Sequence, residues 1–331
     1  MTIKNADKFA ILSCSETNTE FDISDDILEL SDGFFYSQKV PIEITEFWSD
    51  ALGSIQCEEI SNSDFCLIVV KPSVEPDIVN QENNTLRGIC QNYFDALLLT
   101  DTFSCGLAPK LITGSKQNDV MIIRTISSID RPSSIEGAKK SILDINRLSE
   151  AYKIFLNLEK LLSANCYHGR IILALNCFHD AITENHIYER IRNYVRTIEA
   201  FIIPDQGCTG RKFKSRTELF IGSGYHDFFE DLYSLRSAIE HLHDPFKILE
   251  GNTYEEKYKN MFEICFKAEM IARYCLKHFI IHEDIWSSFM PNEAISTFWA
   301  KTPEERREIW GKELDFDELS KKFDPSNIKI K

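Results

Sequence analysis

The segment of this chain with the clearest chemical potential is Arg236-Ser-Ala-Ile-Glu-His241, in which four residues separate an arginine from a histidine. Histidine titrates near neutral pH and can remove or return the proton of a ribose 2′-hydroxyl. Arginine stays charged, and its planar guanidinium suits the negative charge that develops on a phosphate. The pair therefore fits cleavage of RNA by intramolecular transesterification, a reaction that needs no metal.

Residues 227–243 around this pair are predicted to form one helix, because apolar residues recur at intervals of three and four. On an ideal helix, His241 lies about 140° around the axis from Arg236, whereas His243 returns to within about 20° of it. His243 is therefore an alternative to His241. A two-fold dimer would also bring an arginine and a histidine from two chains into one cleft.

A purely structural interpretation of Arg236 is equally simple. Arg236 and Glu240 are spaced i, i+4 and lie beside the apolar stripe of the predicted helix. An exposed pair at this spacing contributes only about 0.3–0.5 kcal/mol. In this interpretation the helix belongs to an adaptor, and Arg236 is an ordinary surface residue.

The elements that must position this segment are mostly helices. Periodic apolar residues predict further helices at residues 140–163, 170–183, 185–203, 213–221 and 253–281. A loop is predicted over residues 204–211, between the third and the fourth of these helices. The first 130 residues are mixed: a helix is predicted at 85–100, and short apolar runs with strand character lie at 8–14, 65–71 and 119–126. The fold class expected is an α+β N-terminal domain followed by an all-α helical bundle.

Four regions are expected along the chain, because residues 127–137 are rich in Ser, Pro and Gly and suggest a linker. Residues 1–130 form an acidic mixed α+β domain, and residues 131–166 form the linker and a connecting helix. Residues 167–283 form the helical domain. Residues 284–331 are a charged, helical C-terminal extension.

The charge of the chain is uneven. Residues 1–86 hold 17 Asp and Glu and 4 Lys, a balance of −13, so the other 245 residues carry only −2 of the total of −15. Binding to RNA depends on the local field, so this acidic balance excludes RNA only from the first quarter. That acidic domain is a candidate for sensing a trigger, restraining a nuclease or binding a regulatory partner.

Composition and residue spacing also bear on cofactor sites, metal sites and membrane association. Ten cysteines are scattered from Cys14 to Cys275 without a C-x-x-C pair, which predicts reduced core thiols and neither a zinc site nor another cofactor. His278 and His282 have the i, i+4 spacing of helix-borne metal ligands, but a third ligand is not evident. No apolar run reaches the roughly 18 residues of a membrane span, and the N-terminus lacks a secretory signal. We therefore expect a cytoplasmic protein without a membrane partner.

From about Tyr167 to about Ile281 the chain resembles the HEPN superfamily, and most closely its Apea-like branch. Four segments carry the resemblance in order: the two core helices at residues 172–181 and 188–201, an Arg-containing helix at 212–220, and Leu235-Arg-Ser-Ala-Ile-Glu-His241, which resembles the R-x(4–6)-H motif. This chain differs from the common pattern at Ser237, where the family often has Asn, Asp or His, and at Leu242, where Apea-like members often have Gly.

The resemblance implies a function. Many HEPN proteins are metal-independent endoribonucleases that act as dimers in toxin–antitoxin, abortive-infection and other antiphage systems. It implies Arg236 as the residue that stabilises the phosphate and His241 as the proton-transfer residue, with His243 as a substitute because the motif tolerates six intervening residues. The alternative is a non-catalytic HEPN module for dimerisation or for binding a partner or nucleotide.

A basic group precedes the motif. Four cationic residues occur within six positions: Arg211, Lys212, Lys214 and Arg216. They are candidates for contacts with the RNA backbone near the active cleft. Two alternatives are open, because a basic loop-to-helix entry is commonly a solvated face, and Arg216 resembles a recurrent family arginine with a structural role.

Overall fold

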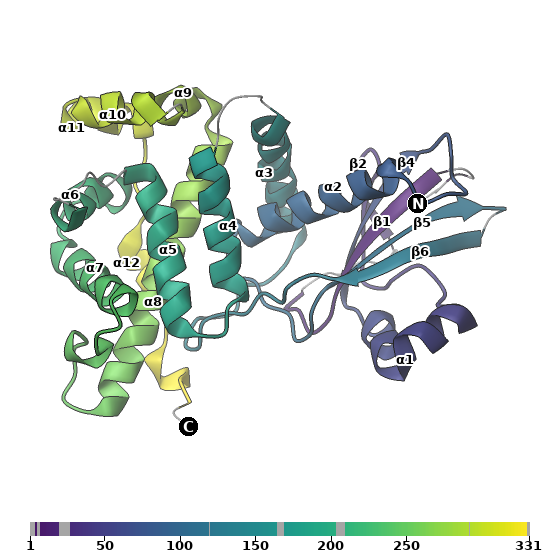
Figure 1. The fold of residues 1–331 in the computed structure, drawn as a ribbon, viewed down its shortest axis with the longest axis horizontal. Helices are drawn as coiled ribbons and strands as arrows, with labels where there is room; N and C mark the ends of the chain where they lie inside the picture. The colour runs from purple at the N-terminus through teal and green to yellow at the C-terminus, as the bar shows by residue number, and fades with distance from the viewer. Residues whose placement is uncertain are drawn as a thin grey trace. The chain divides into compact units, whose positions relative to one another are not determined.

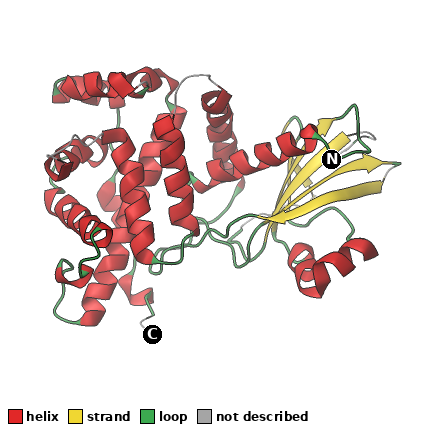
Figure 2. Cartoon of the chain, in the orientation of Figure 1, coloured by secondary structure: helices red, strands yellow, loops and turns green. Residues whose placement is uncertain are grey.

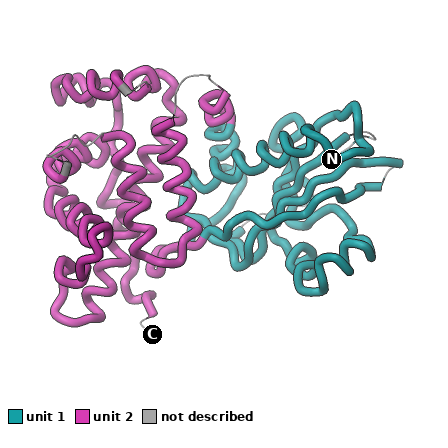
Figure 3. The backbone as a smooth tube through the Cα atoms, in the orientation of Figure 1, with its two compact units in different colours: residues 1–132, 140–155 teal, residues 133–139, 156–331 magenta. Residues whose placement is uncertain are grey.

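The computed structural model describes residue 4 and residues 7–19, 27–118, 120–163, 169–202, 209–290 and 292–329. The predicted start of the helical domain near Tyr167 and most of the predicted loop at 204–211 lie outside these residues. The chain divides into two compact units, coloured separately in Figure 3. Residues 1–132 and 140–155 form the first unit, and residues 133–139 and 156–331 form the second.

The first unit is built on one antiparallel sheet of order β2-β3-β4-β1-β5-β6. Its strands are β1 (Asp7–Cys14), β2 (Ile27–Ser31), β3 (Phe34–Ser37), β4 (Phe65–Pro72), β5 (Lys110–Gln117) and β6 (Val120–Ser128). The predicted strands at 8–14, 65–71 and 119–126 correspond to β1, β4 and β6, with Asp119 outside the described residues. The α+β class expected for the N-terminal region is confirmed.

Two helices cover the sheet, as Figure 2 shows. Every residue of β1 is buried, which requires that both faces of this central strand are covered. On one face Phe9 and Ile11 share an apolar cluster with Trp48 and Leu52 of α1 (Glu46–Ser61). On the other face lies α2 (Gln81–Leu98), which begins at a capping box.

The second unit is helical, as the sequence predicts (Figure 1). Its main helices are the C-terminal part of α3 (Ile145–Ser163), α4 (Gly169–Thr183), α5 (Ile187–Ile202), α6 (Thr209–Ile221), α7 (His226–Glu240) and α8 (Tyr254–Ile281). The central helix α5 packs against α4, α7 and α8. Four predicted bounds are wrong by three residues or more: α2 begins at Gln81 rather than 85, α3 at Ile145 rather than 140, α6 at Thr209 rather than 213, and α7 ends at Glu240 rather than 243.

The C-terminal region closes the core of the second unit. It forms short helices, namely α9 (Trp286–Phe289), α10 (Asn292–Ala300), α11 (Pro303–Trp310) and α12 (Phe316–Ser320). Trp310 is 1% exposed, and its ring centroid lies 6.1 Å from that of Phe201 on α5 and 4.8 Å from that of Phe220 on α6. The indole N–H of Trp299 donates to the Phe201 carbonyl at 2.9 Å. These contacts make residues 286–310 part of the bundle that holds α5 and α6.

A search of the described residues finds no helix that is both long enough and apolar enough to cross a bilayer.

Candidate functional site

The Arg/His motif lies at the C-terminal end of α7, where the chain leaves the helix through a Schellman turn. The His243 N–H donates to the Ala238 carbonyl at 2.8 Å, and the Leu242 N–H donates to the Ile239 carbonyl at 3.3 Å. These two bonds satisfy carbonyls that the helix end would otherwise leave unpaired. His241 is the capping residue of the helix. The helical angles expected for His241 and His243 therefore do not apply, because the helix stops before both.

Leu242 has an unusual conformation for its residue type. Its φ is +56°, in the left-handed region that a Schellman turn requires and that glycine normally occupies. Leu242 is one of the periodic apolar residues of the predicted helix at 227–243, which would place it on the buried face, yet it is 93% exposed, so that prediction is wrong for this residue. A leucine in this region costs about 1–2 kcal/mol relative to ordinary backbone. The turn is thus locally strained and presents an apolar side chain to solvent.

The turn exposes both candidate histidines. His241 and His243 have exposed side chains, and their ring centroids are 6.0 Å apart. The structure therefore brings the two alternatives into one small region. Either imidazole is accessible to a ligand that approaches the end of α7.

Arg236 lies in an ion cluster between α5 and α7. Its Nη2 is 3.5 Å from Glu199 Oε2 and 3.8 Å from Glu240 Oε1, while Arg196 Nη2 is 3.1 Å from Glu240 Oε1. The side chain of Arg236 is 21% exposed, and that of Glu199 is 14% exposed. We call these four residues the α5–α7 cluster. Its pairs connect α5 to α7 beside the motif.

Glu199 is the least exposed member of the α5–α7 cluster. Burial raises the pKa of its carboxyl, Arg236 and Arg196 lower it, and Glu240 raises it further. Both contacts of Arg236 are longer than a normal charge-assisted hydrogen bond. The buried Nε of Arg236 has no hydrogen-bond partner in the described part of the chain. Arg236 is therefore paired with carboxylates but not tightly bonded to them.

The four basic residues predicted to contact RNA do not form one patch. All four lie on α6, where successive residues are about 100° apart, so Lys212 and Arg216 share one face and Arg211 and Lys214 another. Arg216 Nη1 donates to the Ile202 carbonyl at 2.6 Å, and its guanidinium lies 4.9 Å from the Trp299 ring centre. Lys214 pairs with Glu230 at 3.0 Å. The interpretation of Arg216 as structural is the one that these contacts favour.

A second charged network lies at the start of α5, and the sequence did not reveal it. Arg190 is a charged residue of this helix, yet it is only 5% exposed. Its Nη2 lies 3.4 Å from Glu269 Oε2 on α8, and the Tyr194 hydroxyl donates to the same oxygen at 3.0 Å. Arg273 pairs with the other oxygen of Glu269. We call these residues the α5–α8 network.

The described residues contain no group of three or more His, Cys, Asp or Glu side chains that could hold a metal ion. The spaced pair His278 and His282 has ring centroids 4.3 Å apart, and His278 Nε2 is hydrogen-bonded to the Trp310 carbonyl at 2.6 Å. Burial lowers the pKa of His278 to about 4. This histidine therefore has a packing role between α8 and α11.

Comparisons with protein-family models, with curated proteins and with solved structures found no match to this chain.

Proposed function

We propose that this protein is a HEPN-type endoribonuclease that cleaves RNA without a metal ion, with its active residues at the C-terminal end of α7. The observation that carries the proposal is the exposed turn that presents His241 and His243 at the end of the helix that carries Arg236. The order of the four resembling segments, which correspond to α4, α5, α6 and α7, adds support.

The roles follow from the chemistry of the side chains. One imidazole takes the proton of the ribose 2′-hydroxyl as the oxygen attacks the neighbouring phosphorus. A proton returns to the departing 5′-oxygen, and the products are a 2′,3′-cyclic phosphate and a free 5′-hydroxyl. Arg236 stabilises the additional negative charge on the phosphate. For this role Arg236 exchanges its long contacts with Glu199 and Glu240 for the phosphate, in a site that a second copy of the chain completes.

A second candidate function rests on the ion pairs of Arg236. A guanidinium that two carboxylates already neutralise suits a structural position between α5 and α7. In that case the bundle is a non-catalytic module for dimerisation or partner binding. An experiment can distinguish the two functions, because the nuclease needs a catalytic imidazole such as that of His241 and the non-catalytic module does not.

The test is cleavage of single-stranded RNA and tRNA by the purified full chain in EDTA. Variants His241→Ala and His243→Ala are compared with His226→Ala, a matched control whose exposed imidazole pairs with Glu218 at 3.1 Å on α6. We expect cleavage by wild type and by the control. The variant that lacks the catalytic histidine should lose about 100-fold or more of the rate.

The products provide a second readout, because this mechanism leaves cyclic phosphate ends. If neither histidine variant differs from the control, or if cleavage requires a divalent ion, the proposal is wrong. If the wild type does not cleave RNA at all but forms a dimer, the non-catalytic module becomes the better account.

A further inference from the structure

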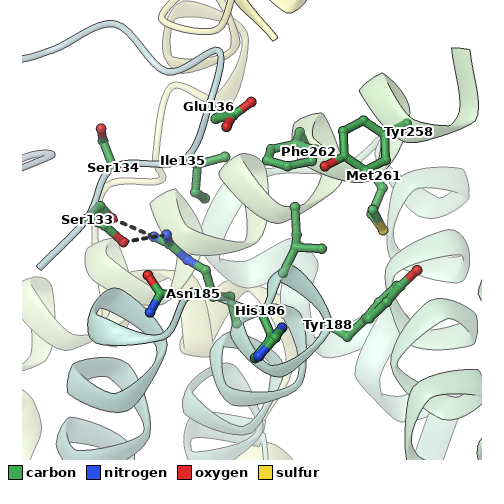
Figure 4. A pocket seen from close by; sticks show the side chains of 12 residues that line it. Ser133, Ser134, Ile135, Glu136, Asn185, His186, Tyr188, Tyr258, Met261 and Phe262 are labelled. Atoms are coloured by element: carbon green, nitrogen blue, oxygen red, sulfur yellow. Dashed lines mark hydrogen bonds between the residues drawn. The ribbon is translucent and has the colours of Figure 1, made fainter. Parts of the chain in front are cut away.

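A cavity of about 450 Å³ lies at the start of α5 and is lined by residues of three segments (Figure 4). Ile135 comes from the segment before α3, His186 and Tyr188 from the start of α5, and Tyr258 and Phe262 from α8. Half of the lining residues are apolar or aromatic, and the others are polar or charged. A volume of this order accommodates a nucleotide-sized ligand.

One of the charged residues in this wall is Arg190 of the α5–α8 network. Its Nη1 donates to Ser133 Oγ at 3.2 Å, and its Nη2 donates to the Ser133 carbonyl at 2.9 Å. The buried Nε has no hydrogen-bond partner in the residues that the structure describes. Arg190 is therefore held by the cavity wall on one side and by Glu269 on the other.

A row of aromatic rings leads from the histidine turn to this cavity. Phe246, three residues after His243, stacks on Tyr254 with centroids 4.9 Å apart and planes 10° apart. Tyr254 stacks on Tyr258 at 6.0 Å, and Tyr258 contacts Phe262 at 4.9 Å. Tyr254 is 63% exposed, and the other three rings are half-buried. We call these four residues the aromatic row.

The cavity and the motif lie at the same end of the α5–α7 pair. Arg196 contacts Glu240 and Glu199 contacts Arg236, so the two helices are antiparallel, and the start of α5 lies beside the chain that follows His243. Tyr188 precedes Arg196 by eight residues, about 12 Å along a helix. Tyr188 and Tyr258 line the same cavity, and Tyr254 stacks on Tyr258, so the aromatic row reaches the start of α5. A few nucleotides of single-stranded RNA span this distance.

We infer that the aromatic row and the cavity bind the unpaired bases of single-stranded RNA that flank the cleavage site at the end of α7. This inference rests on the proposed RNA-cleaving function. Bases of single strands stack on aromatic side chains regardless of sequence, and this contact needs no positive charge. The absence of a need for positive charge is relevant here, because Glu136 lines the cavity and Asp244 lies two residues before Phe246 of the aromatic row. The surface selects bases by stacking, and the phosphates face away from these carboxylates.

The experiment measures binding without cleavage. A fluorescent single-stranded RNA with 2′-O-methyl groups at every position lacks the attacking hydroxyl, so its anisotropy reports affinity alone. Tyr254→Ala and Tyr258→Ala should each weaken binding by about 5- to 100-fold, because one stacked base is lost. Tyr258→Leu keeps the apolar wall and serves if the alanine variant does not fold. Phe47→Ala, an exposed aromatic of the first unit (71%), is the matched control and should bind as wild type.

Two further binding measurements, one at different salt concentrations and one with duplex RNA as competitor, test whether the contact is base stacking. The fold loss should be the same at low and high salt, because stacking involves no phosphate charge, and a duplex of equal length should compete poorly. Tyrosine variants that bind as tightly as wild type, or a wild type that does not bind the single strand, would overturn the inference. Binding that depends on the tyrosines, combined with no cleavage of unmodified RNA, would instead refute the nuclease while the binding surface stands.

Discussion

Helix α5 carries two arginine–glutamate groups that differ in burial. The α5–α8 network is sealed, since Arg190, Glu269 and Arg273 are each no more than 5% exposed. The α5–α7 cluster reaches solvent, where the side chain of Arg196 is 43% exposed. Both groups join α5 to a neighbouring helix with the same residue types. In the second group, Arg236 can exchange Glu240 for a ligand while Glu240 stays paired with Arg196.

This difference in burial indicates that the α5–α7 cluster, and not the α5–α8 network, is the candidate for a functional role. Removing one partner of a buried ion pair leaves a charge without water or counter-ion, so such a network holds helices in place. An exposed pair contributes little to stability and is free to serve another purpose. The histidines support the same division, because His241 and His243 are exposed beside the α5–α7 cluster, while His278 is hydrogen-bonded at a packing contact.

The largest predicted effect is at the α5–α8 network. Glu269→Gln removes the only carboxylate that the described contacts place between Arg190 and Arg273, and should lower the free energy of unfolding by about 3–5 kcal/mol. Glu240→Gln in the α5–α7 cluster is the control and should cost less than about 1 kcal/mol. Urea unfolding followed by tryptophan fluorescence suits both, because Trp286, Trp299 and Trp310 lie in the second unit. Equal losses would remove the distinction between the two groups.

A second prediction compares Arg216 and Lys214, two basic residues of α6 that differ in how exposed their partners are. Arg216→Ala loses a charged hydrogen bond to the Ile202 carbonyl and a contact with Trp299, which together should cost about 2 kcal/mol. Lys214→Ala should cost less than about 0.5 kcal/mol, because its partner Glu230 is 63% exposed. The same unfolding assay applies. A larger loss for Lys214 than for Arg216 would contradict the structural role of Arg216.

The third prediction uses the half-buried His278. Its folded pKa of about 4 is below the unfolded value of 6.5, so the unfolded chain binds more protons between these values. Stability should therefore be fully present above pH 6.5 and fall as the pH drops toward 4. After allowance for solvent screening this amounts to about 2 kcal/mol. His278→Phe should flatten this limb of the pH profile, and an unchanged slope would show that other groups cause it.

The smallest predicted effect is at the strained turn. Leu242→Gly relieves a positive φ but makes the unfolded chain more flexible, so it should raise stability by at most about 1 kcal/mol. Leu242→Ala keeps the strain and is the matched control. A glycine variant less stable than the alanine variant would show that the leucine side chain makes a contact that outweighs the strain.

Much of the fold was accessible from the sequence, and the exceptions have physical causes. The strands β1 and β4 are continuous apolar runs, and the helices of the second unit carry clear apolar periodicity. Strand β2 lies at an edge and is largely half-buried, so its alternation is weak. Helix α1 is kinked at Gly53 and exposes Phe47 and Ile55, which obscures its apolar face.

The site was only partly accessible. The motif residues stand out by type and spacing, but their geometry depends on where α7 ends, and the signal for that end was misleading because Leu242 occupies a position that normally holds glycine. The burial of Arg190 depends on α8, some 80 residues later, so no local pattern reveals it. The aromatic row likewise joins Phe246 to α8 across a turn.

The most direct test of the account compares two arginines of the α5–α7 cluster. Wild type, Arg236→Ala and Arg196→Ala are incubated with single-stranded RNA in EDTA, with unfolding curves measured for each. Both variants lose an ion pair to the same carboxylate, Glu240, and Arg236→Ala also loses its contact with Glu199, so the unfolding curves separate a loss of stability from a loss of cleavage. We predict that Arg236→Ala lowers the cleavage rate by about 100- to 1,000-fold, the usual loss when one donor to a developing oxyanion is removed, while Arg196→Ala stays close to wild type. Equal cleavage by the two variants would contradict the claim that Arg236 acts on RNA.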